Sequence, residues 1–335
     1  MELGVRSVDQ TVSTGDLPEW DRVKAFVDQA YRHSLDVHDG AVTTRIPALS
    51  QADPDLFGIC VAEVTGRTYG AGDVDHPFSL QSISKAFVYA LVCEAVGHDV
   101  VMDRVGVNNT GQAFDSVMAI ELNDGHPMNP MVNAGAMATT ALVPGDTPEA
   151  KWAFVQQGLS RFAGRDLRLD SEVYASEATT NQRNLAIARL LESYDRLDVD
   201  PVAVVDVYTR QCSLLVNAHD LAVMGATLAD GGVNPLTGEQ VVPASACNDT
   251  LAVLATNGLY ERSGEWLFEI GVPGKSGVSG GIVAAAPGKG GIATFSPRLD
   301  TAGNSVRGQR ATAFLSRSLG LNLFASKVHP HSRHR

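Results

Sequence analysis

Strand-like segments lie at both ends of this chain, and the sequence between them is mostly helical in pattern. Near the N-terminus, residues 57–64 and 67–71 are separated by a short glycine-containing connection, which is typical of a hairpin. Near the C-terminus, residues 281–286 and 291–296 form a second such pair. This order predicts an α+β architecture in which an antiparallel sheet is built from the N- and C-terminal segments and flanked by helices, with a helical subdomain inserted at about residues 98–260.

Helices are indicated by segments with one apolar face and by residues that start or stop a helix. Residues 19–33 carry such a face, and a last helix is expected over about 305–319, stopping before a glycine. Within the helical subdomain, a proline suits the first turn of a helix over about 201–216. Asn217 can cap a further helix that ends near Gly231.

The chain is long enough for one large hydrophobic core, and its 44% hydrophobic and 19% charged residues are typical of a globular protein. We expect a single domain over residues 19–322, with residues 1–18 and 323–335 as flexible ends. The last residues are rich in histidine, and a solvated tail explains this better than a metal site.

Charge and composition exclude several classes of function. The formal net charge is −12, which opposes binding to nucleic acid because that affinity comes mainly from lysine and arginine. The longest apolar stretch, residues 86–96, contains Glu94 and is too short for a bilayer, which takes about 20 residues. No signal peptide is recognised, so we expect a cytoplasmic protein without membrane or nucleic-acid partners. The cysteines lie too far apart for a metal or redox motif and are expected to be reduced: Cys60, Cys93, Cys212 and Cys247.

A Ser-x-x-Lys sequence, from Ser82 to Lys85, opens the apolar stretch. The spacing places both side chains on one face of the first turn of a buried helix. A serine hydroxyl needs a base to take its proton, and a lysine desolvated in an apolar pocket can be neutral and act as that base. Taken alone, the tetrapeptide is explained better by a capping serine and a surface lysine.

A second element, Lys275-Ser276-Gly277, matches the Lys-Ser/Thr-Gly sequence that accompanies Ser-x-x-Lys in β-lactamases and penicillin-binding proteins. Such a strand can place a backbone N–H beside that of the nucleophile and so form an oxyanion hole. The alternative is the end of a phosphate-binding loop, which needs glycine at position 269 and a helix afterwards. Position 269 is glutamate and a glycine-rich stretch follows, so the hydrolase interpretation is favoured.

Four longer stretches resemble a known family: residues 80–85, 129–136, 275–281 and 303–308. The match runs over about residues 20–320 and is to the bacterial and mitochondrial glutaminases, whose domain has the serine β-lactamase-like fold. The resemblance implies a hydrolase that cleaves the side-chain amide of L-glutamine to L-glutamate and ammonia through an acyl-serine intermediate. It also implies a homodimer or homotetramer, and we expect no cofactor and no metal.

The resemblance further implies which residues form the site. Ser82 would be the nucleophile, Lys85 its base, and Tyr260 the group that relays a proton to departing ammonia. Glu177 would meet the α-ammonium of the substrate, while asparagines and a tyrosine donate to its α-carboxylate. The backbone N–H groups of Ser82 and Val278 would hold the oxyanion. The full set of expected substrate contacts is Ser82, Asn133, Glu177, Asn184, Tyr208, Tyr260 and Val278.

Three segments depart from the family pattern. Residues 43–47 read Thr-Thr-Arg-Ile-Pro where Ala-Asp-Tyr-Ile-Pro is usual, so Arg45 stands where a substrate-contacting tyrosine is expected. Residues 108–111 replace a usual Glu-Pro-Ser-Gly, and residues 180–183 replace Gly-Asp-Arg. The first departure concerns substrate affinity, and the other two concern loop geometry.

Two other functions stay open on the sequence. One is an enzyme of the same fold that acts on a β-lactam or a peptide, which an acylation assay with a labelled penicillin would identify. The other is a catalytically silent amino-acid-binding protein that keeps the pocket. Release of ammonia from glutamine separates it from an enzyme.

Overall fold

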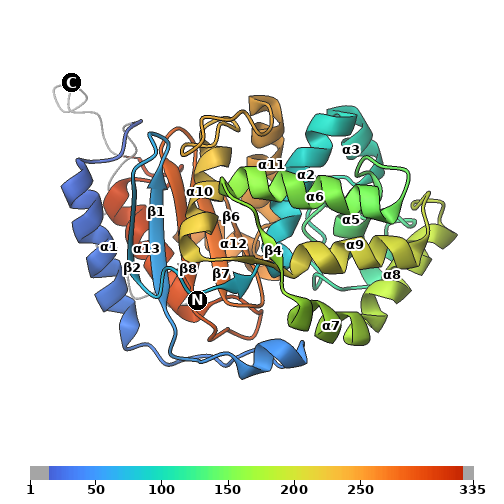
Figure 1. Cartoon of the computed structure of the whole chain (residues 1–335), viewed down its shortest axis with the longest axis horizontal. Helices are drawn as coiled ribbons and strands as arrows, with labels where there is room; N and C mark the ends of the chain where they lie inside the picture. The colour runs from blue at the N-terminus through green and yellow to red at the C-terminus, as the bar shows by residue number, and fades with distance from the viewer. Residues whose placement is uncertain (1–14, 327–335) are drawn as a thin grey trace, which may run out of the picture.

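The computed structural model describes residues 15–326, and its main sheet joins strands from both ends of the chain (Figure 1). This five-stranded sheet is antiparallel, with the order β2-β1-β8-β7-β6. The strands are β1 (Gly58–Glu63), β2 (Thr68–Gly72), β6 (Gly274–Ser276), β7 (Gly281–Ala286) and β8 (Gly290–Phe295). The N-terminal hairpin meets the C-terminal one through β1 and β8, where Cys60 lies opposite Ala293. The predicted α+β architecture is confirmed.

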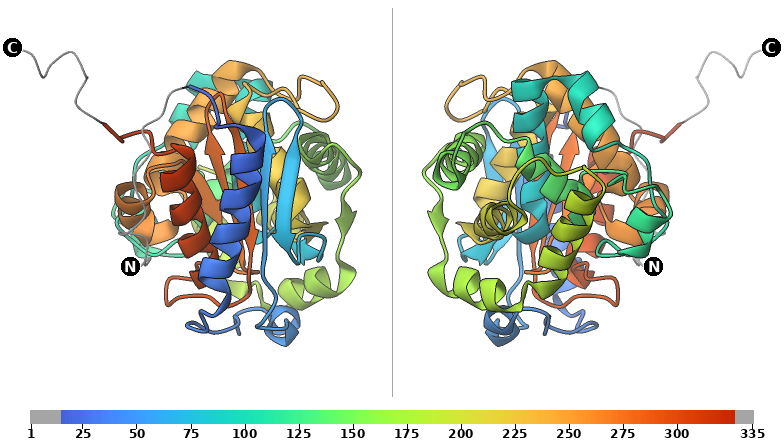
Figure 2. Two further views of the ribbon diagram at one scale, coloured as in Figure 1. Left: turned by 90° about the vertical axis from the view of Figure 1, so that its left-hand side faces the viewer. Right: turned by 90° about the vertical axis from the view of Figure 1, so that its right-hand side faces the viewer.

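The sheet is the middle layer of three, because both of its faces are covered by helices. Side chains alternate across a strand, so Ile59 and Val61 of β1 pack with α1 (Trp20–Leu35) and α13 (Val306–Leu319). These two helices lie side by side on one face of the sheet (Figure 2). Cys60 and Ala62 point the other way, into the larger core cluster.

The opposite face of the sheet is covered by α10 (Ala218–Ala229), which packs on β8, β1 and β7. The predicted cap at Asn217 is confirmed, because its side chain accepts from the backbone N–H of Asp220 and the Asp220 carboxylate accepts in return. Gly225 allows the close approach: a Cβ there would lie 2.9 Å from Val283 Cγ2 and 3.2 Å from Gly291 Cα.

Most of the remaining helices form the part of the molecule to the right of the sheet in Figure 1. They are α2 (Ser84–Val96), α3 (His98–Arg104), α4 (Met118–Glu121), α5 (Asn133–Ala141), α6 (Pro148–Ala163), α7 (Ser171–Thr180), α8 (Gln182–Ser193), α9 (Pro201–Cys212) and α11 (Ala244–Asn257). The α12 helix (Ser263–Glu269) lies by the sheet instead, with Trp266 in the same core cluster as α1 and α13. The α2 helix, buried from Ser84 to Cys93, connects the helical part to the sheet, since its apolar residues belong to the same core cluster as Cys60 and Ala62.

The helix predicted over residues 201–216 is wrong at its end. The α9 helix stops at Cys212, and residues 214–216 form β5 (Leu214–Val216), the middle strand of a small sheet. Its partners are β3 (Phe78–Ser79) and β4 (Arg168–Leu169). Apolar β5 pairs with strands distant in sequence, and helical periodicity does not report such pairing.

The predicted flexible ends, residues 1–18 and 323–335, lie largely outside the described residues, and so does the histidine-rich sequence at 329–335. The division into one domain over residues 19–322 stays a prediction. Over residues 15–326, no helix combines the length and the apolar character that crossing a membrane requires.

Candidate active site

Ser82 follows a sharp turn in the backbone, at the point where β3 gives way to α2. Gln81 adopts a left-handed conformation with φ of 50°, which costs energy for a residue with a side chain. A single 3-10 turn over Gln81–Ile83 then leads into α2. This turn brings Ser82 to a pocket of about 150 Å³, smaller than the ~300 Å³ at which sites for drug-sized ligands begin.

The pocket collects most of the residues predicted to contact substrate. Its walls come from the turn at Ser82, from helices of the helical part and from the loop after β6. The predicted residues among its lining are Ser82, Asn133, Glu177, Asn184, Tyr208 and Val278. The lining residues that the sequence did not predict as substrate contacts are Arg45, Ile46, Gln81, Phe114, Asp115, Thr180, Asn181, Arg183 and Cys212. Lys85 and Tyr260 lie behind this lining.

Lys85 is buried beneath Ser82, one helical turn further along the chain. Its Nζ donates to the Met131 carbonyl oxygen at 3.0 Å and to Asn133 Oδ1 at 2.7 Å. Burial lowers the pKa of Lys85 to about 8, against the weaker attraction of Cys212, Asp115 and Glu177. The described residues include no hydrogen bond between Lys85 and Ser82.

The two acceptors of Lys85 are presented by the stretch over residues 129–136. Asn129 Oδ1 accepts from the backbone N–H groups of Met131 and Val132, which closes a tight turn before α5. Gly135 is required behind this turn, because a Cβ there would lie 1.7 Å from the Asn129 carbonyl oxygen. The turn therefore points the Met131 carbonyl and the Asn133 side chain at Lys85.

Asn133 links Lys85 to the other helices around the pocket. Its Nδ2 donates to Asn184 Oδ1 at 2.8 Å, and its Oδ1 also accepts from the Tyr208 hydroxyl at 3.5 Å. Tyr208 lies beside Cys212 on α9. Burial raises the pKa of the Cys212 thiol to about 12, so this cysteine is a neutral packing residue.

Glu177 is a buried carboxyl group on α7 that lines the pocket. Desolvation raises its pKa to about 7, although a hydrogen bond from Gln81 and the charge of Lys85 lower it in part. Gln81 Nε2 donates to Glu177 Oε2 at 3.4 Å. Among the described residues, Gln81 is the hydrogen-bond donor to this carboxylate.

Tyr260 lies behind Ser82 on a short 3-10 turn, with φ of 57°. Its hydroxyl donates to the Ser276 carbonyl oxygen at 3.3 Å. Burial raises the pKa of Tyr260 to about 12, and hydrogen bonds with Ser82 and Ser276 lower it in part. Lys275, present in the sequence motif but given no role there, donates to the same carbonyl oxygen at 2.9 Å and lies 4.3 Å from the Tyr260 ring centroid.

Val278 reaches the pocket because the loop after β6 packs directly on the turn before Ser82. A Cβ on Gly277 would lie 2.9 Å from the Leu80 carbonyl oxygen and 3.2 Å from Ile83 Cγ1, so this contact requires glycine. Neither Ser82 nor Val278 uses its N–H in a backbone hydrogen bond to another described residue.

Arg45 lies at the mouth of the pocket, with 61% of its side chain exposed. Its Nη1 is 3.4 Å from Asp115 Oδ2, and its guanidinium carbon is 5.0 Å from the Phe114 ring centroid. Arg183, in another departure from the family pattern, donates to the Asp115 carbonyl oxygen at 3.0 Å. Phe114 and Asp115 belong to an irregular loop whose sequence carries no signal for their location.

Residues 15–326 contain no cluster of three histidine, cysteine or acidic side chains placed to hold a metal. The donors around the pocket are amides, hydroxyls and amines. Such a set suits a polar organic ligand better than a cation.

Known proteins resemble this chain over most of its length. The family model described as Glutaminase matches residues 40–324. Glutaminase 2 of Yersinia pestis is 55% identical over 316 residues, which cover 94% of this chain and 93% of that protein. The solved structure of a probable glutaminase, ybaS, has a TM-score of 0.91 at 45% identity and covers 92% of this chain and 100% of its own.

A further solved structure is the covalent complex between the Bacillus subtilis glutaminase YbgJ and 5-oxo-L-norleucine, formed by reaction with 6-diazo-5-oxo-L-norleucine. It has a TM-score of 0.80 at 31% identity and covers 90% of this chain and 99% of its own. Since the family model and the curated relatives span nearly the whole sequence, the chain belongs to the glutaminase family of hydrolases, which act on the amide of glutamine.

Proposed function

We propose that this glutaminase works through an acyl-serine intermediate formed on Ser82, with L-glutamine as its substrate. The observation that carries the proposal is the position of Ser82 on the pocket, with Lys85 buried one turn below it and held by two acceptors. The covalent complex of the Bacillus subtilis relative supports a nucleophile at a site of this kind.

Lys85 is the base in this proposal. A neutral lysine amine has two N–H donors and one lone pair. The Met131 carbonyl and Asn133 Oδ1 take both donors, so the lone pair is the remaining feature of the amine and can accept the Ser82 proton. A pKa of about 8 makes the neutral form accessible near neutral pH.

Two backbone N–H groups and one tyrosine would act on the oxyanion and on the leaving group. Among the described residues, the N–H groups of Ser82 and Val278 have no backbone partner, and they would donate to the oxygen of the tetrahedral intermediate. Tyr260, hydrogen bonded with Ser82, would pass a proton to the departing ammonia. The proton that Lys85 took from Ser82 then returns to the Tyr260 phenolate, which leaves Lys85 neutral. Water hydrolyses the ester, with neutral Lys85 as base again.

The amino-acid end of glutamine would bind across the helical wall of the pocket. Glu177 is buried, and among the described residues Gln81 donates a hydrogen bond to it, so an α-ammonium would supply a charged donor to the carboxylate. Asn184, Asn133 and Tyr208 would donate to the α-carboxylate.

A homodimer or homotetramer is part of the proposal, following the family resemblance. Exposed apolar side chains offer surface for such contacts. Met118 begins α4 and Leu122 follows its last residue, one turn later, while Phe268 lies on α12. A cytoplasmic location is likewise proposed, because all four cysteines are buried and unpaired, as suits a reducing compartment.

Replacing Ser82 with alanine tests the nucleophile. Ammonia release should fall by about 10⁴-fold or more, because every later step passes through the ester. Mass spectrometry after treatment with 6-diazo-5-oxo-L-norleucine should show an adduct on the parent protein and none on the variant. Lys85→Met should lose nearly as much activity, and the double variant little more than either. Substantial activity in Ser82→Ala would rule out the covalent mechanism.

The pH dependence should report Glu177 and Lys85. Both must be deprotonated for productive binding and attack, so kcat/KM should rise with pH through about 7 and about 8. Glu177→Gln should lose the step near the lower pH and keep the step near the higher one.

Glu177→Gln should also weaken binding of glutamine far more than binding of an analogue without the α-amine. Equal losses for both ligands would place Glu177 away from the ammonium.

Gly277→Ala tests the contact that holds the oxyanion loop. The new Cβ would lie 2.9 Å from the Leu80 carbonyl oxygen, so the loop must move and kcat should fall by about 10²-fold. Gly264→Ala is the matched control, because a Cβ there meets nothing within 4 Å. Equal activity of the two variants would show that the contact does not matter for catalysis.

Arg45→Tyr restores the residue usual in the family. Arg45 is mostly exposed and already paired with Asp115, so its contribution to binding a carboxylate is that of a surface ion pair, at most about fivefold. We expect KM for glutamine to rise by up to that factor while kcat changes little, because the α-carboxylate lies far from the reacting amide. A fall in kcat with an unaltered KM would contradict a role in substrate binding.

A further inference from the structure

The segment over residues 37–55, here called the strap, connects α1 to β1 and passes the mouth of the pocket. In Figure 1 it runs below the sheet from α1 toward α7 and then returns to β1. Its short 3-10 helix (Pro47–Gln51) lies beside α7, at the point farthest from α1. There, the backbone N–H of Ala48 donates to Ser176 Oγ at 3.1 Å. Between its ends, the strap carries Arg45 and Ile46 to the pocket.

The two ends of the strap are fastened by one buried side chain, Arg307, at the start of α13. Its Nε donates to the Val37 carbonyl oxygen at 2.7 Å, and its Nη1 donates to the Asp55 carbonyl oxygen at 3.0 Å. Its Nη2 lies 3.3 Å from His38 Nδ1. All three contacts are to the ends of the strap, and none is to a residue that lines the pocket.

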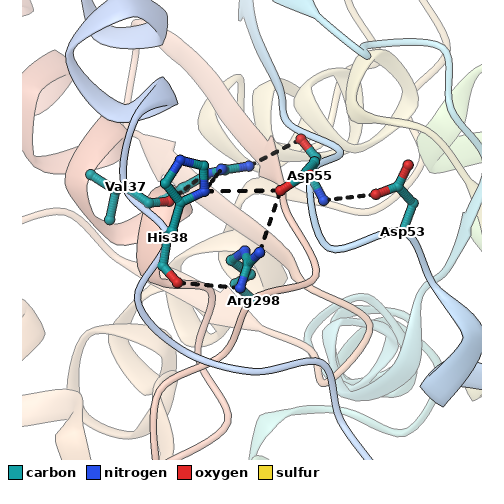
Figure 3. A network of polar contacts seen from close by, with 6 residues as sticks. Val37, His38, Asp53, Asp55 and Arg298 are labelled. Atoms are coloured by element: carbon teal, nitrogen blue, oxygen red, sulfur yellow. Dashed lines mark hydrogen bonds and ion pairs between the residues drawn. The ribbon is translucent and has the colours of Figure 1, made fainter.

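A second arginine holds the same ends from outside. Arg298 Nη1 donates to the His38 carbonyl oxygen at 3.2 Å, and its Nη2 donates to Asp55 Oδ1 at 3.4 Å. Figure 3 shows Val37 and His38 from one end facing Asp55 from the other, with Arg298 between them. The backbone N–H of Asp55 also donates to Asp53 Oδ1 at 2.9 Å, which shapes the returning end.

Arginine suits the inner position for a geometric reason. Its planar guanidinium presents several N–H groups in fixed directions, so one side chain can satisfy two carbonyl oxygens that belong to distant residues. Only 1% of Arg307 is exposed, and burial lowers the pKa of its guanidinium. The protein therefore keeps a cation at a position where desolvation disfavours the charged form. Lysine would keep the charge but could not reproduce the fork.

We propose that Arg307 is a positioning residue for substrate binding: it fixes both ends of the strap to the sheet and so holds Arg45 and Ile46 at the pocket. The inference rests on the proposed function in that glutamine is taken to occupy this pocket. It assigns a task to the stretch over residues 303–308, which carries family resemblance but touches the pocket through no side chain of its own.

The first test measures the strap without catalysis. Arg45 is exposed and is followed by Ile46, so trypsin can cut the strap there when it leaves the surface. We expect the Arg45–Ile46 bond of folded Arg307→Lys to be cut about fivefold faster than in the parent protein, since one hydrogen bond to a charged group is lost. Arg165→Lys is the matched control. It alters an arginine that pairs with buried Asp220 and contacts neither the strap nor the pocket.

The second test measures glutamine hydrolysis in the same proteins. Arg307→Lys should raise KM for glutamine by about fivefold and leave kcat within about twofold, while Arg165→Lys leaves both unchanged. The double variant Arg45→Tyr with Arg307→Lys should show less than the product of the two single effects on KM, because Arg307 acts partly through Arg45. A purely structural role would lower the melting temperature and move neither KM nor the cut at Arg45.

The outcomes separate this inference from the proposed function. Unchanged cutting at Arg45 overturns the role of Arg307, whatever the kinetics show. Faster cutting with an unaltered KM overturns it as well, because the strap would then be loosened without consequence for substrate. Neither result bears on Ser82, whose adduct is measured separately. If Arg307→Lys does not fold, the same two measurements are made on Arg298→Gln, which removes the outer contacts to the same two ends. Faster cutting at Arg45 with a higher KM supports the inference, and an unchanged cut or KM overturns the claim that fastening these ends holds Arg45 and Ile46 at the pocket.

Discussion

Close packing between the loop after β6 and the turn before Ser82 is the constraint on which the rest of the site depends. The contact is made by backbone atoms, and only glycine at position 277 leaves room for it. It sets the spacing between the N–H groups of Ser82 and Val278, and it places Ser276 against Tyr260. Because β6 is held in place by β7 and β8, the position of the loop is inherited from the C-terminal part of the sheet. The nucleophile turn comes from the N-terminal half of the chain, so the site exists only once both ends have joined.

Burial acts in opposite directions on the two titratable groups that matter most. Desolvation disfavours the charged form, which lowers the pKa of an amine and raises that of a carboxyl group. Lys85 therefore falls to about 8 while Glu177 rises to about 7, and each opposes the shift of the other through its charge. Burial thus brings the pKa values of an amine and a carboxyl group, which lie several units apart in water, close to neutral pH.

The sequence predicts the parts of the molecule that depend on local patterns. Short glycine-containing connections indicate the two hairpins of the main sheet, and the cap at Asn217 indicates the start of α10, because both signals come from neighbouring residues. The end of α9 was missed, because β5 depends on pairing with distant strands. The roles of the site residues came from the family resemblance, and they remain proposals. What the pattern could not give is the arrangement around Lys85, whose partners come from a turn more than forty residues away.

Arg45 shows how a departure from the family pattern can be absorbed by its surroundings. A new guanidinium at the mouth of a pocket would add a charge that favours any anion, yet here Asp115 lies 3.4 Å from it and Phe114 lies beneath it. Binding of a carboxylate would therefore exchange one exposed ion pair for another, and the difference between two such pairs is small. The backbone of the strap is fixed separately, at its two ends, by contacts of Arg307 and Arg298 that do not involve the side chain at position 45. The contacts that fasten the strap therefore place no requirement on the residue at position 45.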